Sequence, residues 1–327
     1  MRIFHVSLTK YFQTYVKSAP MLYFLLSVLF TVALYLIMRS YPKYQVNSFH
    51  AVVFNYYACV ITGLFLTPDI KAFQQIQWDS EGTILTLALG TLFVIAFMSI
   101  GLTAQKVSVT AASLAGNMSL VIPVLFGLFV FKNTNKEFTF LNYTGLVIAL
   151  GALALGAIQK KEKSTEFEHG QPLEVSALSY VWLLPVFTFL ASGTNNTLIN
   201  YLTMQYFRPE QTTLFMIIAC SGAILIGTLL LLYKILFGGE KLTLRSVVGG
   251  LILGVPNFLS LYFLLLALGS FGNSAAFVFP IYNILTMLVS SFAAWILYKE
   301  KLNNLNRLGL ALAVVAIVLI SYQELGF

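Results

Sequence analysis

Residues 83–104, TILTLALGTLFVIAFMSIGLTA, form an apolar run without a charged side chain. A helix that crosses a bilayer needs about 20 mainly apolar residues, so this run is long enough to span a membrane once. Similar runs recur along the chain and predict an all-α membrane protein with ten transmembrane helices. The predicted spans cover residues 21–38, 50–67, 83–104, 107–131, 141–158, 179–201, 211–235, 246–268, 273–298 and 306–322.

The composition supports a membrane protein. Of the 327 residues, 58% are hydrophobic and only 9% are charged, whereas a soluble domain carries about 25% charged residues. The net charge of +7 does not indicate a nucleic-acid partner, because Lys and Arg lie between apolar runs rather than on one solvated face. The spans leave no room for a soluble catalytic domain. We therefore expect membrane lipid, and no nucleic acid, around this chain.

The ionisable residues do not predict an enzyme. All twelve carboxylates lie outside the predicted spans or at their edges, and His50 at the start of the second span is interpreted as an interfacial residue. The two cysteines, Cys59 and Cys220, lie inside apolar runs and predict neither a disulfide framework nor a metal cluster. Chemistry inside a membrane needs a nucleophile, a metal site or paired acid and base groups. We therefore expect no catalytic residue, no metal and no cofactor.

A shift of 164 residues aligns the two halves of the chain. The aligned blocks are 87–90 (LALG) with 251–254 (LILG), 110–112 (TAA) with 274–276 (SAA), and Asn142 with Asn306. We therefore divide the chain into a tail that could lie at the interface (1–20), a first five-helix repeat (21–158), a linker (159–178) and a second five-helix repeat (179–323). Because five is odd, the second repeat enters the membrane inverted. Inverted repeats are typical of secondary transporters, whose substrate site lies near the midplane.

A family resemblance agrees with the repeat. Residues 273–320 contain a Ser-Ala-Ala start, Pro280 and the exit sequence YKEKL at 298–302. This pattern resembles the second repeat of EamA-type transporters of the drug/metabolite transporter superfamily, and residues 107–128 with Pro123 are similar to the first repeat. The resemblance implies two inverted five-helix repeats that move small metabolites such as amino acids across the cytoplasmic membrane, often outward.

Polar side chains recur at helical spacing on several predicted spans, where facing a cavity costs less than facing lipid. The resemblance implies that helices one, three, four, six, eight and nine surround the cavity, which excludes the second-span stripe of Asn55, Cys59 and Thr62. Each polar residue has an alternative role, because Ser and Thr bond to their own helix and Asn joins helices. The predicted substrate-binding residues are Thr110, Ser113, Asn117, Ser192, Asn195, Asn196, Asn257, Tyr282, Asn283 and Thr286.

These observations predict a secondary transporter, an exporter of a small neutral or zwitterionic metabolite that works by alternating access. A membrane receptor, a structural protein and an intramembrane enzyme are the alternatives, and both a monomer and a homodimer are compatible with the sequence. Lys and Arg divide seven to twelve between the tail side and the other side. The positive-inside rule would put both termini outside, whereas the family resemblance implies both inside, and we follow the resemblance.

Overall fold

The computed structural model describes residues 20–67, 76–129, 139–157, 181–207, 211–270 and 275–325. These residues form helices and contain no strand, which confirms the all-α class. The predicted linker 159–178 and the tail up to residue 19 lie outside the described residues. The helices are α2 (Pro20–Ser40), η1 (Tyr41–Tyr44), α3 (Ser48–Leu66), α4 (Glu81–Lys106), α5 (Val109–Met118), α6 (Val121–Phe129), α7 (Phe140–Ala157), α8 (Leu183–Tyr206), α9 (Thr212–Leu236), α10 (Leu244–Ser270), α11 (Ala275–Tyr298), α12 (Asn304–Ile320) and α13 (Tyr322–Leu325).

Seven helical segments are long and apolar enough to cross a membrane. Their presence makes the chain a multi-pass membrane protein. Two further apolar helices, Phe140–Gly156 and Asn304–Ile320, are shorter. The seven segments are Met21–Tyr44, Ser48–Leu66, Glu81–Lys106, Val109–Phe126, Thr212–Leu236, Leu244–Leu268 and Val278–Tyr298.

The predicted span 107–131 is divided into α5 and α6 by a break at residues 119–120. Proline has no N–H and is tolerated in the first turn of a helix, and Pro123 lies in the first turn of α6. At the break, the N–H of Ile122 donates to the carbonyl of Ser119 at 3.0 Å, three residues earlier in the chain. Pro123 therefore lies at the start of a new helix, whereas α11 runs unbroken through Pro280.

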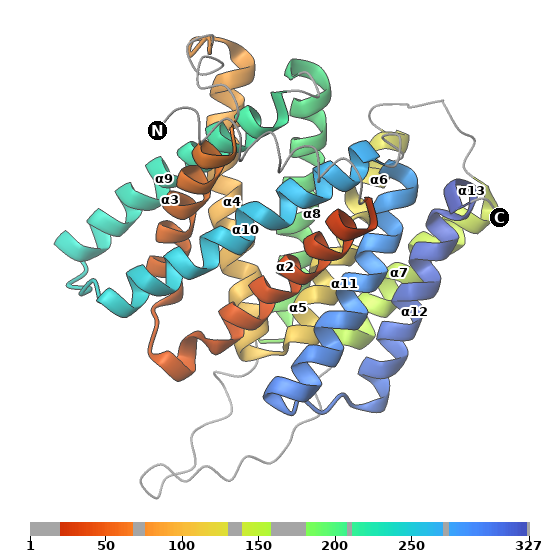
Figure 1. The fold of residues 1–327 in the computed structure, drawn as a ribbon. Helices are drawn as coiled ribbons and strands as arrows, with labels where there is room; N and C mark the ends of the chain where they lie inside the picture. The colour runs from red at the N-terminus through yellow and green to blue at the C-terminus, as the bar shows by residue number, and fades with distance from the viewer. Residues whose placement is uncertain are drawn as a thin grey trace, which may run out of the picture.

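The helices pack as a bundle with α5 near its centre. On one side of the bundle, α3 packs against α9 and α10, and α4 packs against α8 and α9; on the other side, α7 and α12 lie side by side (Figure 1). Between these groups, α5 contacts α4, α8 and α11, while α2 contacts α10 and α11. This arrangement surrounds α5 with helices from both halves of the chain.

The last helices of the two halves, α7 and α12, are joined by a reciprocal pair of amide hydrogen bonds. Asn142 near the start of α7 donates through Nδ2 to the carbonyl of Ile320 at 2.8 Å, at the end of α12. Asn306 near the start of α12 donates through Nδ2 to the carbonyl of Gly156 at 3.1 Å, at the end of α7. The two helices therefore run antiparallel. Gly145 and Gly309 pack closely between these helices, because a Cβ atom on Gly145 would lie 2.9 Å from the backbone nitrogen of Ile320 and one on Gly309 would lie 2.9 Å from the carbonyl oxygen of Ala152.

Glycines bring two other helix pairs into backbone contact. A Cβ atom on Gly90 of α4 would lie 2.2 Å from the backbone nitrogen of Ala223 on α9. A Cβ atom on Gly254 of α10 would lie 2.2 Å from the carbonyl oxygen of Asn55 on α3. A side chain cannot fit at such distances, so glycine is required at both positions. The 164-residue shift aligns these two glycines with each other.

Candidate functional site

The first group of predicted substrate-binding residues lies on α5, where Thr110, Ser113 and Asn117 are all buried. Ser113 Oγ donates to the carbonyl of Thr110 at 3.1 Å, and Asn117 Nδ2 donates to the carbonyl of Ser113 at 2.6 Å. These two side chains therefore satisfy hydrogen bonds within their own helix, as Ser and Asn often do. The hydroxyl of Thr110 has no hydrogen-bond partner among the described residues.

The second group lies on α11, which packs against both α5 and α2. Tyr282 shares a 2.6 Å hydrogen bond with the hydroxyl of Thr31 on α2, and this bond connects the two halves of the chain. Asn283 and Thr286 are buried. Thr286 has no exposed surface, and its hydroxyl lies near that of Tyr282 without forming a hydrogen bond of normal geometry to any residue that the structure describes. Thr31 could not be found from the sequence, because it is a single polar residue in an apolar run.

The third group lies on α8, which also packs against α5. Asn196 is exposed and donates through Nδ2 to the hydroxyl of Ser119 at 3.2 Å, beside the break between α5 and α6. Ser192 is buried, and its hydroxyl and the Oδ1 atom of Asn195 have no partner in the described part of the chain. One turn earlier, Thr188 shares a 2.7 Å hydrogen bond with Thr103 of α4.

Asn257, the remaining predicted residue, belongs to a different polar contact. Its Nδ2 atom donates to Oδ1 of Asn55 on α3 at 3.1 Å, which joins α10 to α3. Asn257 is therefore connected to the second-span stripe that the sequence analysis placed outside the cavity. The other nine predicted residues are carried by α5, α8 and α11, which are in contact through α5.

Four buried side-chain oxygens without a partner among the described residues therefore lie on three neighbouring helices of the bundle centre. They belong to Thr110, Ser192, Asn195 and Thr286. A buried polar atom without a hydrogen bond costs about 1–3 kcal/mol, so such atoms call for an explanation. Hydroxyl and amide oxygens can accept hydrogen bonds from a ligand. We define these four residues as the central polar cluster.

One end of the bundle is closed by hydrogen bonds between the end of α2, the start of α3 and the start of α10. Tyr41 donates through its hydroxyl to the carbonyl of Gly249 at 3.1 Å, and the N–H of Asn47 donates to the hydroxyl of Ser246 at 2.9 Å. Arg245 also donates to Oε1 of Gln45 at 2.7 Å. We call this region the closed end.

The same end holds a buried histidine. His50 is 1% exposed, and its Nε2 atom lies 2.9 Å from Oε2 of Glu240, in the connection between α9 and α10. Lys234 lies 2.8 Å from the other carboxylate oxygen. The hydrogen bonds from Lys234 and then from His50 hold the pKa of the Glu240 carboxyl below its ordinary value. His50 lies in the first turn of α3, and its carboxylate partner allows it to be buried there.

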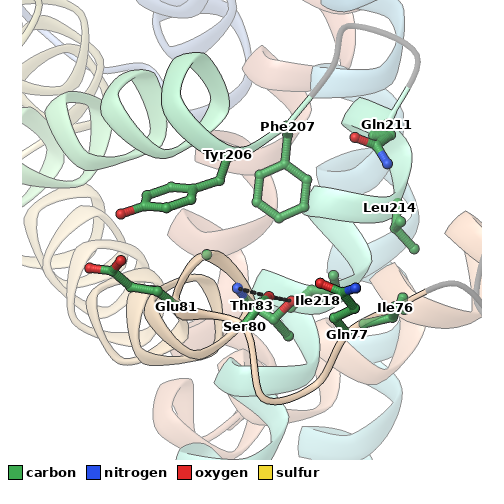
Figure 2. A pocket seen from close by; sticks show the side chains of 11 residues that line it. Ile76, Gln77, Ser80, Glu81, Thr83, Tyr206, Phe207, Gln211, Leu214 and Ile218 are labelled. Atoms are coloured by element: carbon green, nitrogen blue, oxygen red, sulfur yellow. Dashed lines mark hydrogen bonds between the residues drawn. The ribbon is translucent and has the colours of Figure 1, made fainter.

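The opposite end of the bundle contains a pocket of about 370 Å³ between the start of α4, the end of α8 and the start of α9. Figure 2 shows Tyr206 and Phe207 on one side of this pocket and Ser80 and Glu81 on the other. Its lining combines aromatic rings with hydroxyl, amide and carboxylate groups. None of the predicted substrate-binding residues lines it. We call this pocket the end pocket.

The comparisons with known proteins establish the fold but no activity. No family model matches the chain. An uncharacterized protein of Haemophilus influenzae is 25% identical over 304 residues, which cover 91% of this chain and 97% of the relative. A protein of known crystal structure superposes with a TM-score of 0.52 at 12% identity, covering 94% of this chain and 97% of that chain. The chain is thus similar in fold, over nearly its whole length, to a protein of known structure.

Proposed function

We propose that the protein is a secondary transporter that moves a small polar metabolite across the cytoplasmic membrane by alternating access. In this proposal ten helices form two inverted five-helix repeats of the EamA type, with α5 and α6 counted as one and the four-residue helices η1 and α13 left out. The observation that carries this proposal is the reciprocal pairing of Asn142 and Asn306 with the ends of each other's helices. The two asparagines are aligned by the 164-residue shift, and so are the carbonyls of Gly156 and Ile320 that accept from them.

A second pair of contacts supports the same symmetry. Gly90 on the third helix of the first half packs against α9, the second helix of the other half. Gly254, aligned with Gly90, packs against α3, the second helix of the first half. Two inverted halves that exchange equivalent contacts can adopt two related conformations, one open to each side, which is the basis of alternating access.

In a conformation that is open to one side only, one end of the bundle is closed and the other is open. The two ends of this bundle differ in the same way. The closed end is formed by α2, α3 and α10, and the end pocket is formed by the corresponding helices of the other half, α8, α9 and α4. The interface at the closed end is therefore joined by hydrogen bonds, whereas the equivalent interface at the other end contains the end pocket. With both termini in the cytoplasm, the end pocket faces the cytoplasm, which suits an exporter that loads its substrate there.

The substrate class follows from the central polar cluster. Its atoms are hydroxyl and amide oxygens, which accept hydrogen bonds from ammonium, amide or hydroxyl groups. None of the four residues is charged, and Glu300 brings one carboxylate beside Thr110, since its Oε2 atom accepts from the N–H of Val109 at 3.3 Å and its Oε1 atom is buried without a partner among the described residues. We therefore propose a neutral or zwitterionic metabolite of amino-acid type as the substrate.

Counterflow in liposomes tests this proposal. Purified protein is reconstituted, each liposome is loaded with one unlabelled neutral amino acid, and uptake of the labelled compound is measured without an ion gradient. We expect uptake to overshoot its equilibrium value for at least one compound, whereas empty liposomes show no overshoot. A receptor would bind the compound without counterflow, and this outcome would contradict the proposal.

A further inference from the structure

Gly116 is the one residue of α5 that is not buried. The other nine residues of this helix, all of which the structure describes, are buried, whereas Gly116 keeps accessible surface. Helices α2, α4, α7, α8, α11 and α12 all pack against α5. The accessible surface at Gly116 therefore borders a space inside the bundle, which we call the Gly116 space.

Tyr35 of α2 faces the Gly116 space. A Cβ atom on Gly116 would lie 2.9 Å from the hydroxyl oxygen of Tyr35 and 3.9 Å from the ring carbon that carries this hydroxyl. Outside α5, no other atom of the described residues would lie within 4 Å of that Cβ atom. Tyr35 itself is 6% exposed. One hydroxyl group, at the end of a long side chain, therefore bounds the open space on the bare backbone of α5.

The Gly116 space adjoins the α11 group of predicted substrate-binding residues. Thr31 and Tyr35 are four residues apart on α2, so their side chains lie on the same face of that helix. Thr31 shares the 2.6 Å hydrogen bond with the hydroxyl of Tyr282 on α11. One face of α2 therefore meets α11 through Thr31 and α5 through Tyr35.

The same space also adjoins the α8 group. Ser119 donates to the carbonyl of Gly116 at 2.6 Å, and its hydroxyl oxygen accepts from Nδ2 of Asn196 on α8 at 3.2 Å. Asn196 is exposed, and a polar side chain in a membrane bundle costs less when it faces a polar space than when it faces lipid. Gly116 therefore lies between the α8 and α11 groups of predicted substrate-binding residues.

We propose that Gly116 and Tyr35 select the transported amino acid by the size of its side chain. The missing Cβ atom of Gly116 leaves room for the substrate side chain against the backbone of α5, and the ring and hydroxyl of Tyr35 limit that room. The space accepts neutral amino acids whose side chains extend beyond a methyl group, such as leucine and glutamine. This inference rests on the proposed transport function, because it assigns the specificity of the same site.

Gly116→Ala tests the selection without unfolding the protein. The only close neighbour of the new methyl group is the end of the Tyr35 side chain, which can move, whereas the neighbour at Gly90 is backbone and cannot. The variant is therefore expected to keep the melting temperature of the wild type. The methyl group and the displaced Tyr35 hydroxyl would then occupy room that a large substrate side chain needs.

Binding is measured as the thermal stabilisation of the purified full-length protein by increasing concentrations of glycine, alanine, leucine and glutamine. In Gly116→Ala we expect the apparent affinity for leucine and glutamine to fall by about tenfold or more, the scale that one methylene has in a fitted pocket. The affinity for glycine should change little. Gly151→Ala is the matched control, because nothing lies within 4 Å of a Cβ atom there, and it should leave all four affinities unchanged.

A double variant tests the part of Tyr35. In Gly116→Ala/Tyr35→Phe the hydroxyl is absent, and the nearest remaining atom of the ring lies 3.9 Å from the new Cβ atom, an ordinary contact distance. The ring is no longer displaced, so we expect the double variant to regain part of the affinity for leucine that Gly116→Ala loses. If the double variant bound leucine as weakly as Gly116→Ala does, Tyr35 would not limit the space.

The outcomes separate this inference from the proposed function. An equal loss of affinity for all four amino acids in Gly116→Ala, or no loss for any, would overturn the size selection while wild-type counterflow upheld transport. Size-dependent binding without counterflow would support the selection and contradict the transport function alone. If the wild type neither bound nor transported any of the four amino acids, both proposals would be wrong.

Discussion

Asn142 and Asn306 hold α7 and α12 together by the same hydrogen bond made in both directions. Each amide donates to the last carbonyls of the opposite helix, at 2.8 Å and 3.1 Å respectively. The final carbonyls of a helix have no partner within it, and in lipid such groups must be satisfied by the protein. The pair therefore contributes both to packing and to helix termination.

Replacing either asparagine is expected to weaken the bundle to the same extent. Asn142→Ala and Asn306→Ala should each lower the free energy of unfolding by about 1 kcal/mol, the scale of a hydrogen bond between membrane helices. The measurement is thermal unfolding of the purified protein in detergent. Asn304→Ala is the control, because Asn304 is exposed on the same helix turn. If the two variants differed strongly in their free energy of unfolding, the two asparagines would not make equivalent contributions to stability.

The close glycine contacts predict a sharp difference among Gly→Ala variants. Gly90→Ala and Gly254→Ala force a methyl group into neighbouring backbone and should each destabilise by about 1–3 kcal/mol or more. Gly151→Ala should be neutral or slightly stabilising, because nothing lies within 4 Å of a Cβ atom there and alanine favours the helix. Expression level and melting temperature measure the effect. A tolerated Gly90→Ala would show that α4 and α9 are farther apart than described.

The central polar cluster predicts a loss of binding without a loss of stability. Thr286→Val keeps the side-chain shape and removes a buried hydroxyl that has no partner among the described residues, so the melting temperature should stay equal or rise. Stabilisation by neutral and zwitterionic amino acids, measured by thermal shift, should fall.

Thr188→Val is the matched control, because it breaks the 2.7 Å hydrogen bond to Thr103 and should lower stability. Asn195→Ala and Asn283→Ala extend the test to the amides. If none of these changes altered the binding of a confirmed ligand, the predicted site would be wrong.

The ion cluster at the closed end predicts an acid-sensitive contact. The pKa of Glu240 is lowered by Lys234 and His50, so the folded state favours the carboxylate, and its contribution to stability is present above the ordinary value of 4.5. That contribution is lost as the pH falls through the lower pKa of the folded state. Glu240→Gln should lower the melting temperature at neutral pH and reduce its fall on acidification below pH 4.5. If Glu240→Gln left the pH dependence of the melting temperature unchanged, the contacts of Glu240 with Lys234 and His50 would not contribute to stability.

The sequence alone determined the helical class and the approximate boundaries of the helices. These properties follow from local chemistry, because about 20 apolar residues without charge favour one structure in lipid. The run 83–104 corresponds to α4, Glu81–Lys106, and the start of the last span at 306 lies close to Asn304.

Only the tertiary structure decided which polar groups meet. Cys59 and Cys220 are far apart in the sequence, yet the packing of α3 against α9 brings both into one buried core cluster. His50 is buried because Glu240, far away in the sequence, reaches it. Such pairings depend on helix order and rotation across the bundle, which a periodic pattern within one helix does not encode. The sequence therefore determines the helices and their inward faces, whereas packing between distant helices determines the contacts that carry function.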